Sequence, residues 1–178
     1  MISKEEFIIQ HLTEDKKYQD IIEENPGLIR KQLSEWWEEE LELREEIKKS
    51  NQLFAAKIGK EEFSEFKEMG KRGFYEWYHQ QPKKCAYCGI EEYKLKALFN
   101  YESGILSTKR QRGRFLELER KDADTNKYSP QNCVLACYLC NNHKSDLISE
   151  EDHKTYFAKA IKDYLDNKYQ LLNDNRSE

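Results

Sequence analysis

Apolar residues recur every three or four positions through most of residues 3–80, a spacing that predicts helices with one buried face. Asn25-Pro26 reads as a helix start, with Asn as the N-cap and Pro in the first turn. The apolar positions that follow are Leu33, Trp36, Trp37, Leu41, Leu43, Ile47, Phe54 and Ile58. A further helix is predicted from residue 60 to about residue 80, with Gly70 and Gly73 as candidate breaks. The first 80 residues are therefore expected to form a helical arm.

The pattern changes after Pro82, where shorter elements alternate with polar loops. Residues 91–99 can form a short helix, residues 114–120 alternate as a strand does, and residues 133–136 form a second, apolar strand. Ser149 then begins a terminal helix, with Asp152 in the capping-box position. This succession predicts an α+β fold, in which a mostly helical chain carries a small strand-loop-strand core.

Composition favours a folded chain outside the membrane. Of the 178 residues, 38% are hydrophobic and 12% aromatic, and aromatic side chains supply a core that disordered segments lack. No apolar run approaches the roughly 18 residues that a membrane helix needs. The first residues lack the basic-then-apolar pattern of a secretory signal. We therefore expect a cytoplasmic protein that binds no membrane.

The net charge of −4 hides an uneven distribution of charge along the chain. Residues 1–50 carry 8 basic and 14 acidic side chains, whereas residues 81–121 carry 10 basic and 5 acidic ones. A ligand responds to the local field, so the middle of the chain can attract a polyanion that its beginning repels. The acidic run at residues 38–40 is read either as the solvated face of a helix or as a docking surface for a partner.

Four of the five cysteines form two Cys-x-x-Cys pairs, Cys85/Cys88 and Cys137/Cys140, which are separated by 48 residues. Each such turn can aim both of its sulfurs at one Zn²⁺, and a reducing cytosol disfavours disulfides. We therefore expect a structural zinc site that joins distant segments; a redox-active pair and unrelated buried cysteines are the alternatives. Cys133 lies in an apolar run and is expected to be a small buried side chain.

Three runs in this part of the chain resemble the HNH nuclease family, also called ββα-metal or His-Me finger nucleases. They are residues 116–120 (LELER), residues 132–137 (NCVLAC) and residues 140–146 (CNNHKSD). In that family a β-hairpin and a helix hold a divalent cation, and many members carry two Cys-x-x-Cys pairs, one before the hairpin and one where the helix begins. The resemblance covers residues 81–148. It implies a zinc-stapled nuclease core, on which a C-terminal helix at residues 149–178 packs.

The resemblance implies a role for several polar residues. Glu119 stands in the place of the metal-binding Asp, Asn141 in that of the helical metal ligand, and Asn132 in that of the residue that fixes the loop between the strands. Mg²⁺ or Mn²⁺ would bind to Glu119 and Asn141, and Lys144, one turn after Asn141, would contact phosphate. The implied activity is metal-dependent hydrolysis of phosphodiester bonds in DNA or RNA.

Arg120 departs from the family, because it occupies the place of the general-base His. A guanidinium stays protonated and cannot take a proton from water. In the first reading the protein is an active variant, with Arg120 on phosphate and Asp122 or a metal-bound hydroxide as the base. In the second it is an inactive, nuclease-like zinc module that binds nucleic acid or a protein partner. In the third the zinc module is unrelated to nucleases.

A basic loop directly precedes the first predicted strand and is expected to clamp the nucleic-acid backbone at the rim of the site. Its basic residues are Lys109, Arg110, Arg112 and Arg114. The alternative is a flexible, solvated loop. His143 lies about 200° around the predicted helix from Asn141 and is expected to point away from the cleft. The remaining histidines, which are expected at the surface, are His11, His79 and His153.

The predicted organisation is an acidic helical arm at residues 1–80, the nuclease core at 81–148, and the C-terminal helix. A small HNH protein with an acidic helical extension is also similar to the nuclease subunits of bacterial anti-phage systems, which work beside an ATPase. That similarity implies an antiviral role and an ATPase partner that docks on the acidic N-terminal helices.

Overall fold

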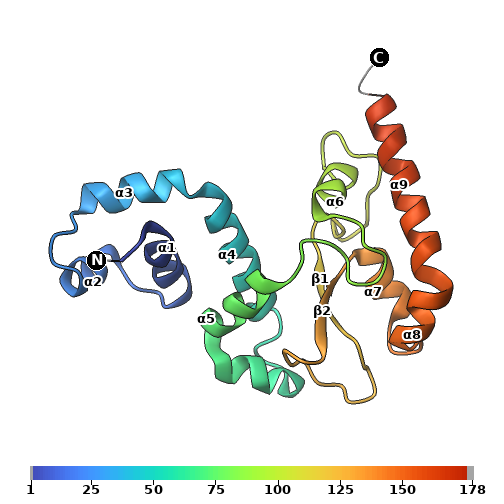
Figure 1. Cartoon of the computed structure of the whole chain (residues 1–178), viewed down its shortest axis with the longest axis horizontal. Coiled ribbons are helices and arrows are strands. Elements are labelled where there is room, and N and C mark those ends of the chain that lie inside the picture. Colours follow the sequence, from blue (N-terminus) through green and yellow to red (C-terminus); the bar gives the residue numbers. More distant parts are fainter. Residues whose placement is uncertain (1, 176–178) are drawn as a thin grey trace. The chain divides into compact units, whose positions relative to one another are not determined.

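The computed structural model describes residues 2–175 of the chain. The chain divides into two compact units between Gln80 and Gln81, and each unit has its own interior (Figure 1). No helix in the described part is both long enough and apolar enough to cross a membrane.

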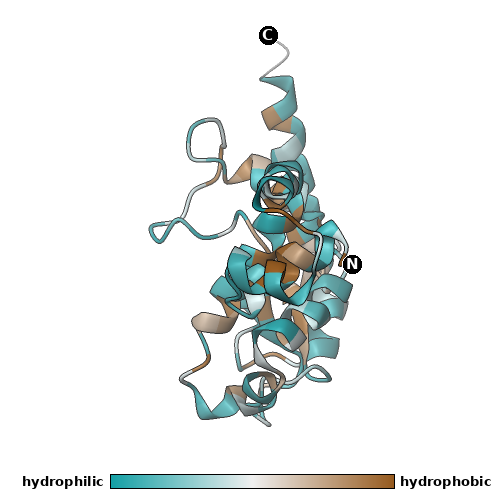
Figure 2. Cartoon of the chain, turned by 90° about the vertical axis from the view of Figure 1, so that its left-hand side faces the viewer, coloured by the Kyte–Doolittle hydropathy of each residue, from teal (hydrophilic) through white to brown (hydrophobic). Residues whose placement is uncertain are grey.

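The N-terminal unit is built only from helices in its described residues. They are α1 (Lys4–Thr13), α2 (Tyr18–Glu24), α3 (Arg30–Glu39), α4 (Leu41–Ala55), the short 3-10 turn η1 (Glu61–Phe63) and α5 (Ser64–Gln80). Phe7, Leu33 and Ile47 are fully buried in one cluster, which joins α1, α3 and α4. Most other positions on the helices in the view of Figure 2 are hydrophilic. The helical periodicity of the sequence thus corresponds to one buried face on each helix.

A second, aromatic cluster joins η1, α4 and α5. The Phe66 ring lies 4.9 Å from the Phe74 ring and 4.9 Å from the Trp77 ring, and Phe54 lies 5.6 Å from Phe63, all measured between centroids. Helix α5 breaks at Gly70, whose φ of 71° is favourable only for glycine. The break that Gly70 predicted is therefore present.

The prediction that Asn25-Pro26 starts a helix is wrong. Helix α2 ends at Glu24, and Asn25 is its C-cap, with its side-chain Nδ2 donating to the carbonyl of Ile21 at 3.0 Å. Gly27 then takes a φ of 106°, so the chain turns before α3 begins at Arg30. The Asn side chain closes the preceding helix because a carbonyl of that helix lies within its reach.

The C-terminal unit is α+β, as predicted, with a two-stranded antiparallel sheet among helices. Its elements are α6 (Glu92–Leu98), β1 (Glu117–Arg120), β2 (Cys133–Ala136), α7 (Tyr138–Lys144), α8 (Glu150–Asp152), the π-helical turn η2 (His153–Phe157) and α9 (Ala158–Asp174). Helix α9 packs against α6 and α7 (Figure 1). Ser149 caps α8 as predicted, since its Oγ accepts from the Asp152 amide at 3.0 Å.

The strand β1 positions the candidate site. It pairs with β2 so that Glu117 lies opposite Ala136 and Glu119 opposite Val134. Side chains alternate along a strand, so Glu117 and Glu119 share one face of β1 while Leu118 takes the other. Both carboxylates are hydrogen-bonded to side chains of α7.

Candidate metal centre and nuclease site

The first cysteine knuckle is a tight turn attached to the sheet. The amide of Cys85 donates to the Ile90 carbonyl, and the amide of Gly89 donates to the Cys85 carbonyl, each at 2.9 Å. Gly89 has a φ of 74°, which closes the turn without strain. The Ala86 amide donates to the carbonyl of Leu135 at 2.9 Å and so fastens the knuckle to β2.

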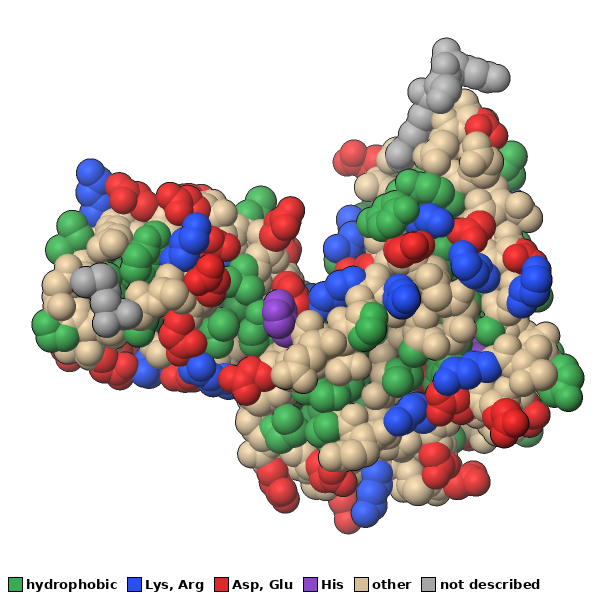
Figure 3. Space-filling view, viewed as in Figure 1, with side chains coloured by type: hydrophobic (Ala, Val, Ile, Leu, Met, Phe, Trp, Pro, Cys, Tyr) green, Lys and Arg blue, Asp and Glu red, His purple; other side chains and the backbone are tan. Residues whose placement is uncertain are grey.

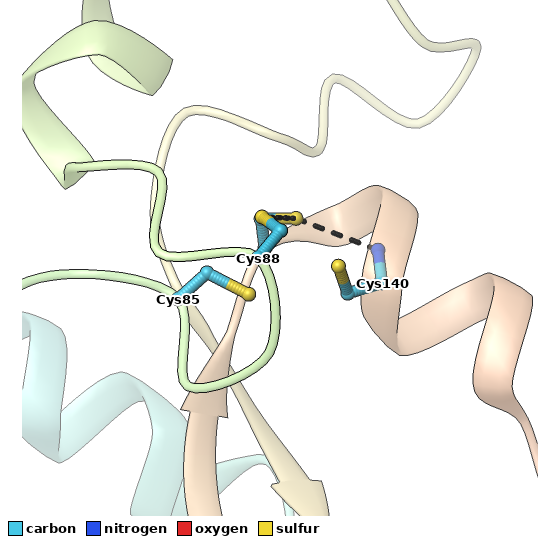
Figure 4. A group of neighbouring side chains, drawn as sticks. Cys85, Cys88 and Cys140 are labelled. Carbon is cyan, nitrogen blue, oxygen red and sulfur yellow. Dashed lines mark hydrogen bonds between the residues drawn. The ribbon is translucent and has the colours of Figure 1, made fainter. Parts of the chain in front are cut away.

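The second knuckle lies where β2 passes into α7. Cys137 is the N-cap of α7, and its sulfur accepts from the Cys140 amide at 3.4 Å. The sulfurs of Cys85, Cys88, Cys137 and Cys140 are buried and lie within 4.8 Å of one another. Figure 4 shows the side chains of Cys85, Cys88 and Cys140 pointing toward one another.

The spacing of the four sulfurs fits zinc. A tetrahedral site with Zn–S bonds of about 2.3 Å sets its sulfurs about 3.8 Å apart. The sulfurs of Cys88 and Cys137 are separated by 3.8 Å. Cys133 is also buried but does not belong to the group. The two sequence-distant pairs thus form one site that is compatible with Zn²⁺ in a purely structural role.

The close packing of the sulfurs shifts the pKa values of Cys85, Cys137 and Cys140. Hydrogen bonds with Cys137, Cys140 and Cys88 lower the pKa of Cys85, because they stabilise its thiolate. The pKa of Cys140 is raised instead, chiefly through its hydrogen bond with Cys137. A thiolate in this group therefore disfavours ionisation of the neighbouring thiols. A divalent cation would remove this electrostatic repulsion by stabilising all four thiolates.

Glu119 and Lys144 form a buried ion pair between β1 and α7. Lys144 Nζ lies 3.3 Å from Glu119 Oε1 and 3.0 Å from the Arg120 carbonyl. The side chain of Lys144 is 1% exposed. The expectation that Lys144 presents its charge to phosphate is therefore wrong for this structure. Its stem packs inward because α7 lies over β1, and its ammonium group neutralises a carboxylate of the chain itself.

Asn141 lies on the same helix but bonds to Glu117. Its Nδ2 donates to Glu117 Oε2 at 2.7 Å. Arg112 also binds the Glu117 carboxylate. Its Nε donates to Oε1 at 2.9 Å, and its Nη2 donates to Oε2. These hydrogen bonds raise the pKa of Arg112 above its ordinary value. Sequence reasoning missed Glu117, although its position two residues before Glu119 on a strand was the signal for a shared face.

The loop between the strands is held by Asn132. Its Oδ1 accepts from the Asp122 amide at 2.9 Å, and its Nδ2 donates to the carbonyls of Asp122 and Lys127 at 2.8 Å each. This bonding fixes the backbone directly after β1. Arg120 extends along the loop, contacting Asn126 and lying 4.9 Å from the Tyr128 ring centroid.

The basic loop is only partly available to a ligand. Lys109 and Arg110 are exposed, whereas Arg112 is paired with Glu117 and Arg114 lies 4.8 Å from the Tyr101 ring centroid. Lys109, Arg110 and Arg112 line a cavity of about 580 Å³, which Tyr138 and Asn142 of α7 also line. The basic loop and α7 thus share this cavity, and the bond between Arg112 and Glu117 joins the loop to β1.

His153 is the histidine whose burial contradicts the prediction. It is fully buried, not at the surface, and neither of its ring nitrogens has a hydrogen-bond partner among the residues that the structure describes. Its ring lies 5.1 Å from Tyr87 and 5.4 Å from His143, between centroids. Burial lowers the pKa of His153, and the neighbouring His143 lowers it further. His143 itself packs on Phe157, 4.5 Å between centroids.

Comparisons with known proteins bear on the fold of this site. No family model matches the chain, and no curated protein matches its sequence. A solved structure of the rare-cutting HNH restriction endonuclease PacI, described for its mechanism of DNA perturbation, is similar to the chain. The TM-score is 0.52 and the sequence identity 28%, over 66% of this chain and 78% of that chain. The chain has an HNH-type nuclease fold.

The HNH-type fold is the one that the resemblance of the three sequence runs implied, and it supports a nuclease-type function. The part that Arg120 plays in this fold stays a prediction. The oxygens of Glu119 and Asn141 are of the kind that Mg²⁺ and Mn²⁺ prefer, so the donor set suits a hard divalent cation.

Proposed function

We propose that the protein is a metal-dependent endonuclease that hydrolyses phosphodiester bonds of DNA. The observation that carries the proposal is the HNH-type fold itself, in which the carboxylate of Glu119 on β1 lies against α7. The structurally similar restriction endonuclease PacI acts on DNA, which favours DNA over RNA as the substrate of this protein.

Glu119 and Asn141 would hold the divalent cation. Lys144 bonds to Oε1 of Glu119 and so orients the carboxylate. Nδ2 of Asn141 donates to Glu117, so its carboxamide oxygen would be the ligand atom. When bound, the cation supplies charge neutralisation at the scissile phosphate and lowers the pKa of a water molecule.

Asp122 is the candidate general base. Arg120 cannot accept a proton, and Asp122 is the first carboxylate after it. The backbone of Asp122 is fixed on both sides by Asn132, so its side chain starts from a defined position. Arg120 would then bind phosphate, since a guanidinium matches two phosphate oxygens at once. Asp122 would take the proton from the attacking water.

A plasmid-nicking assay tests the proposal. The zinc-loaded protein is incubated with supercoiled plasmid and Mg²⁺ or Mn²⁺. We expect nicking that Glu119→Gln and Asp122→Asn each reduce by roughly 100-fold or more. The control variant is Asp163→Asn on α9, whose carboxylate pairs with Lys159 at the surface. Equal activity in Glu119→Gln and the wild type would overturn the assignment.

A second candidate function is a nucleic-acid-binding module without turnover. Two observations favour it: Arg120 replaces the expected histidine, and both carboxylates of the site are already in ion pairs of the chain. The module would bind DNA tightly in every cation and leave the plasmid intact. The same assay, read by gel shift as well as by nicking, separates the two functions.

We further propose an antiviral role in which the acidic N-terminal unit docks a partner such as an ATPase. The charge of residues 1–50 supports it, and acidic side chains are spread over the N-terminal unit in the view of Figure 3. Expression of the full chain together with its genomic neighbours should lower phage plaque counts. Glu119→Gln should restore the counts, and unchanged counts with the wild type would contradict the role.

A further inference from the structure

Glu117 has two partners that compete for its oxygens with any cation. Arg112 contacts both oxygens in a bidentate manner, and Asn141 donates to Oε2. The Glu117 side chain is 15% exposed, and the Arg112 side chain 38%. The pair therefore lies at the edge of the site, where an incoming ligand can reach the guanidinium.

The backbone of Arg112 is fixed although its guanidinium is accessible. Thr108 Oγ1 accepts from the Arg112 amide at 2.7 Å and donates to its carbonyl at 3.0 Å. Gly113 has a φ of 112°, and a Cβ there would lie 2.7 Å from the Phe99 ring. The loop thus holds Arg112 at one place, from which only the side chain can move.

The two ion pairs of the site differ in kind. Lys144 is 1% exposed and is bound to both Glu119 and the Arg120 carbonyl, so it cannot leave without opening the core. Arg112 can exchange its carboxylate for a phosphate, because both anions present two oxygens to the planar guanidinium in the same geometry. Lys109 and Arg110 line the same cavity as Arg112 and would draw a phosphate there.

We propose that Glu117 is a ligand of the same divalent cation as Asn141, and that Arg112 masks Glu117 until a substrate phosphate takes the guanidinium. The inference rests on the proposed function. Glu117 and Glu119 share one face of β1, and the Asn141 carboxamide contacts Glu117, so a carboxylate and a carboxamide lie side by side between β1 and α7. When the Arg112 guanidinium moves from Glu117 to a phosphate, the Glu117 carboxylate loses its cationic partner. The divalent cation then neutralises the charge of that carboxylate.

The consequence is that substrate and cation bind cooperatively. Phosphate unmasks a cation ligand, and by linkage the cation releases Arg112 for phosphate to the same extent. The chain alone would then bind the cation weakly, and a bound phosphodiester would strengthen cation binding.

Mn²⁺ binding to the full-length, zinc-loaded protein tests this, measured by the EPR signal of free Mn²⁺ without turnover. Arg112→Gln should raise Mn²⁺ affinity in the absence of DNA by roughly fivefold or more, and should abolish the further gain on adding a duplex oligonucleotide. Glu117→Gln should lower Mn²⁺ affinity while raising DNA affinity, because Arg112 is freed. Arg112→Lys, which keeps the charge but not the bidentate contact, should fall between wild type and Arg112→Gln.

The control is Arg110→Gln, which should weaken DNA binding and leave Mn²⁺ affinity unchanged. Zinc content and melting temperature close to those of the wild type establish that each variant is folded. Unchanged Mn²⁺ affinity in Arg112→Gln or in Glu117→Gln overturns the inference while wild-type nicking still supports the proposed function. Failure of the wild type to bind Mn²⁺ or to nick DNA overturns both.

Discussion

Lys144 Nζ lies 3.3 Å from Oε1 of Glu119, and both residues are buried. Removing one partner of a buried pair leaves the other charge without compensation, which typically costs about 3–5 kcal/mol. We expect Lys144→Met to lower the free energy of unfolding by that amount, measured by urea denaturation. The double variant Lys144→Met/Glu119→Leu should recover most of the loss, because no uncompensated charge remains.

The matched control for this pair is Lys159→Met on α9, whose partner Asp163 is exposed. An exposed pair contributes at most about 1 kcal/mol, so this variant should unfold close to the wild type. A loss in Lys144→Met no larger than in Lys159→Met would contradict the buried pair.

Zinc should be required for the fold of the C-terminal unit. The four cysteines join the knuckle before α6 to the start of α7, so loss of zinc removes this link and leaves four buried thiols without their metal. We expect Cys137→Ser to lose bound zinc and to show a large loss of cooperative unfolding by circular dichroism. Cys133→Ser is the control: it should keep one zinc per chain, measured by atomic absorption.

The elements that sequence predicted well are those whose signals are local. Residues 133–136 form β2 with the predicted bounds, and Ser149 caps a helix with Asp152 in its capping-box position. The Cys-x-x-Cys spacing likewise indicated a single four-sulfur group, because each knuckle is a turn that its own residues define. Such signals need no knowledge of the rest of the fold.

The residues that sequence misplaced depend on packing between elements. Lys144 and His153 are polar and were expected to reach solvent, yet both are buried. Lys144 is buried because it lies on the face of α7 that packs against β1. The π-helical turn η2 contributes to the burial of His153, because it shifts the register of the helix. Glu117 was overlooked for the same reason, since its partners Arg112 and Asn141 come from a loop and a helix.

Lys109 and Arg110 are the exposed basic residues of the loop and should contribute most of its phosphate contacts. The double variant Lys109→Gln/Arg110→Gln should bind duplex DNA more weakly. It should also reduce the slope of log K against log salt by about 2, since each lost phosphate contact lowers the slope by roughly 0.9. Fluorescence anisotropy at four salt concentrations measures it. Lys159→Gln/Lys168→Gln on α9 removes the same charge elsewhere in the unit and should leave the slope nearly unchanged.

His153 should make the fold sensitive to mild acid. Burial lowers its pKa below the ordinary value of about 6.5, so below that pH the unfolded chain binds a proton that the folded chain does not. The free energy of unfolding therefore falls as the pH drops from 7.5 to 5.5. His153→Phe removes this proton uptake and fills the space beside Tyr87 and Phe157, so its stability should fall less over the same range.

The thiolate site adds its own acid sensitivity to wild type and variant alike, so the informative quantity is the difference between their unfolding free energies at each pH. That difference should grow in favour of His153→Phe as the pH falls. His79→Phe, at an exposed position paired with Glu46, is the matched control and should show no such growth. A pH-independent difference for His153→Phe would mean that His153 is protonated equally in both states, contrary to its burial.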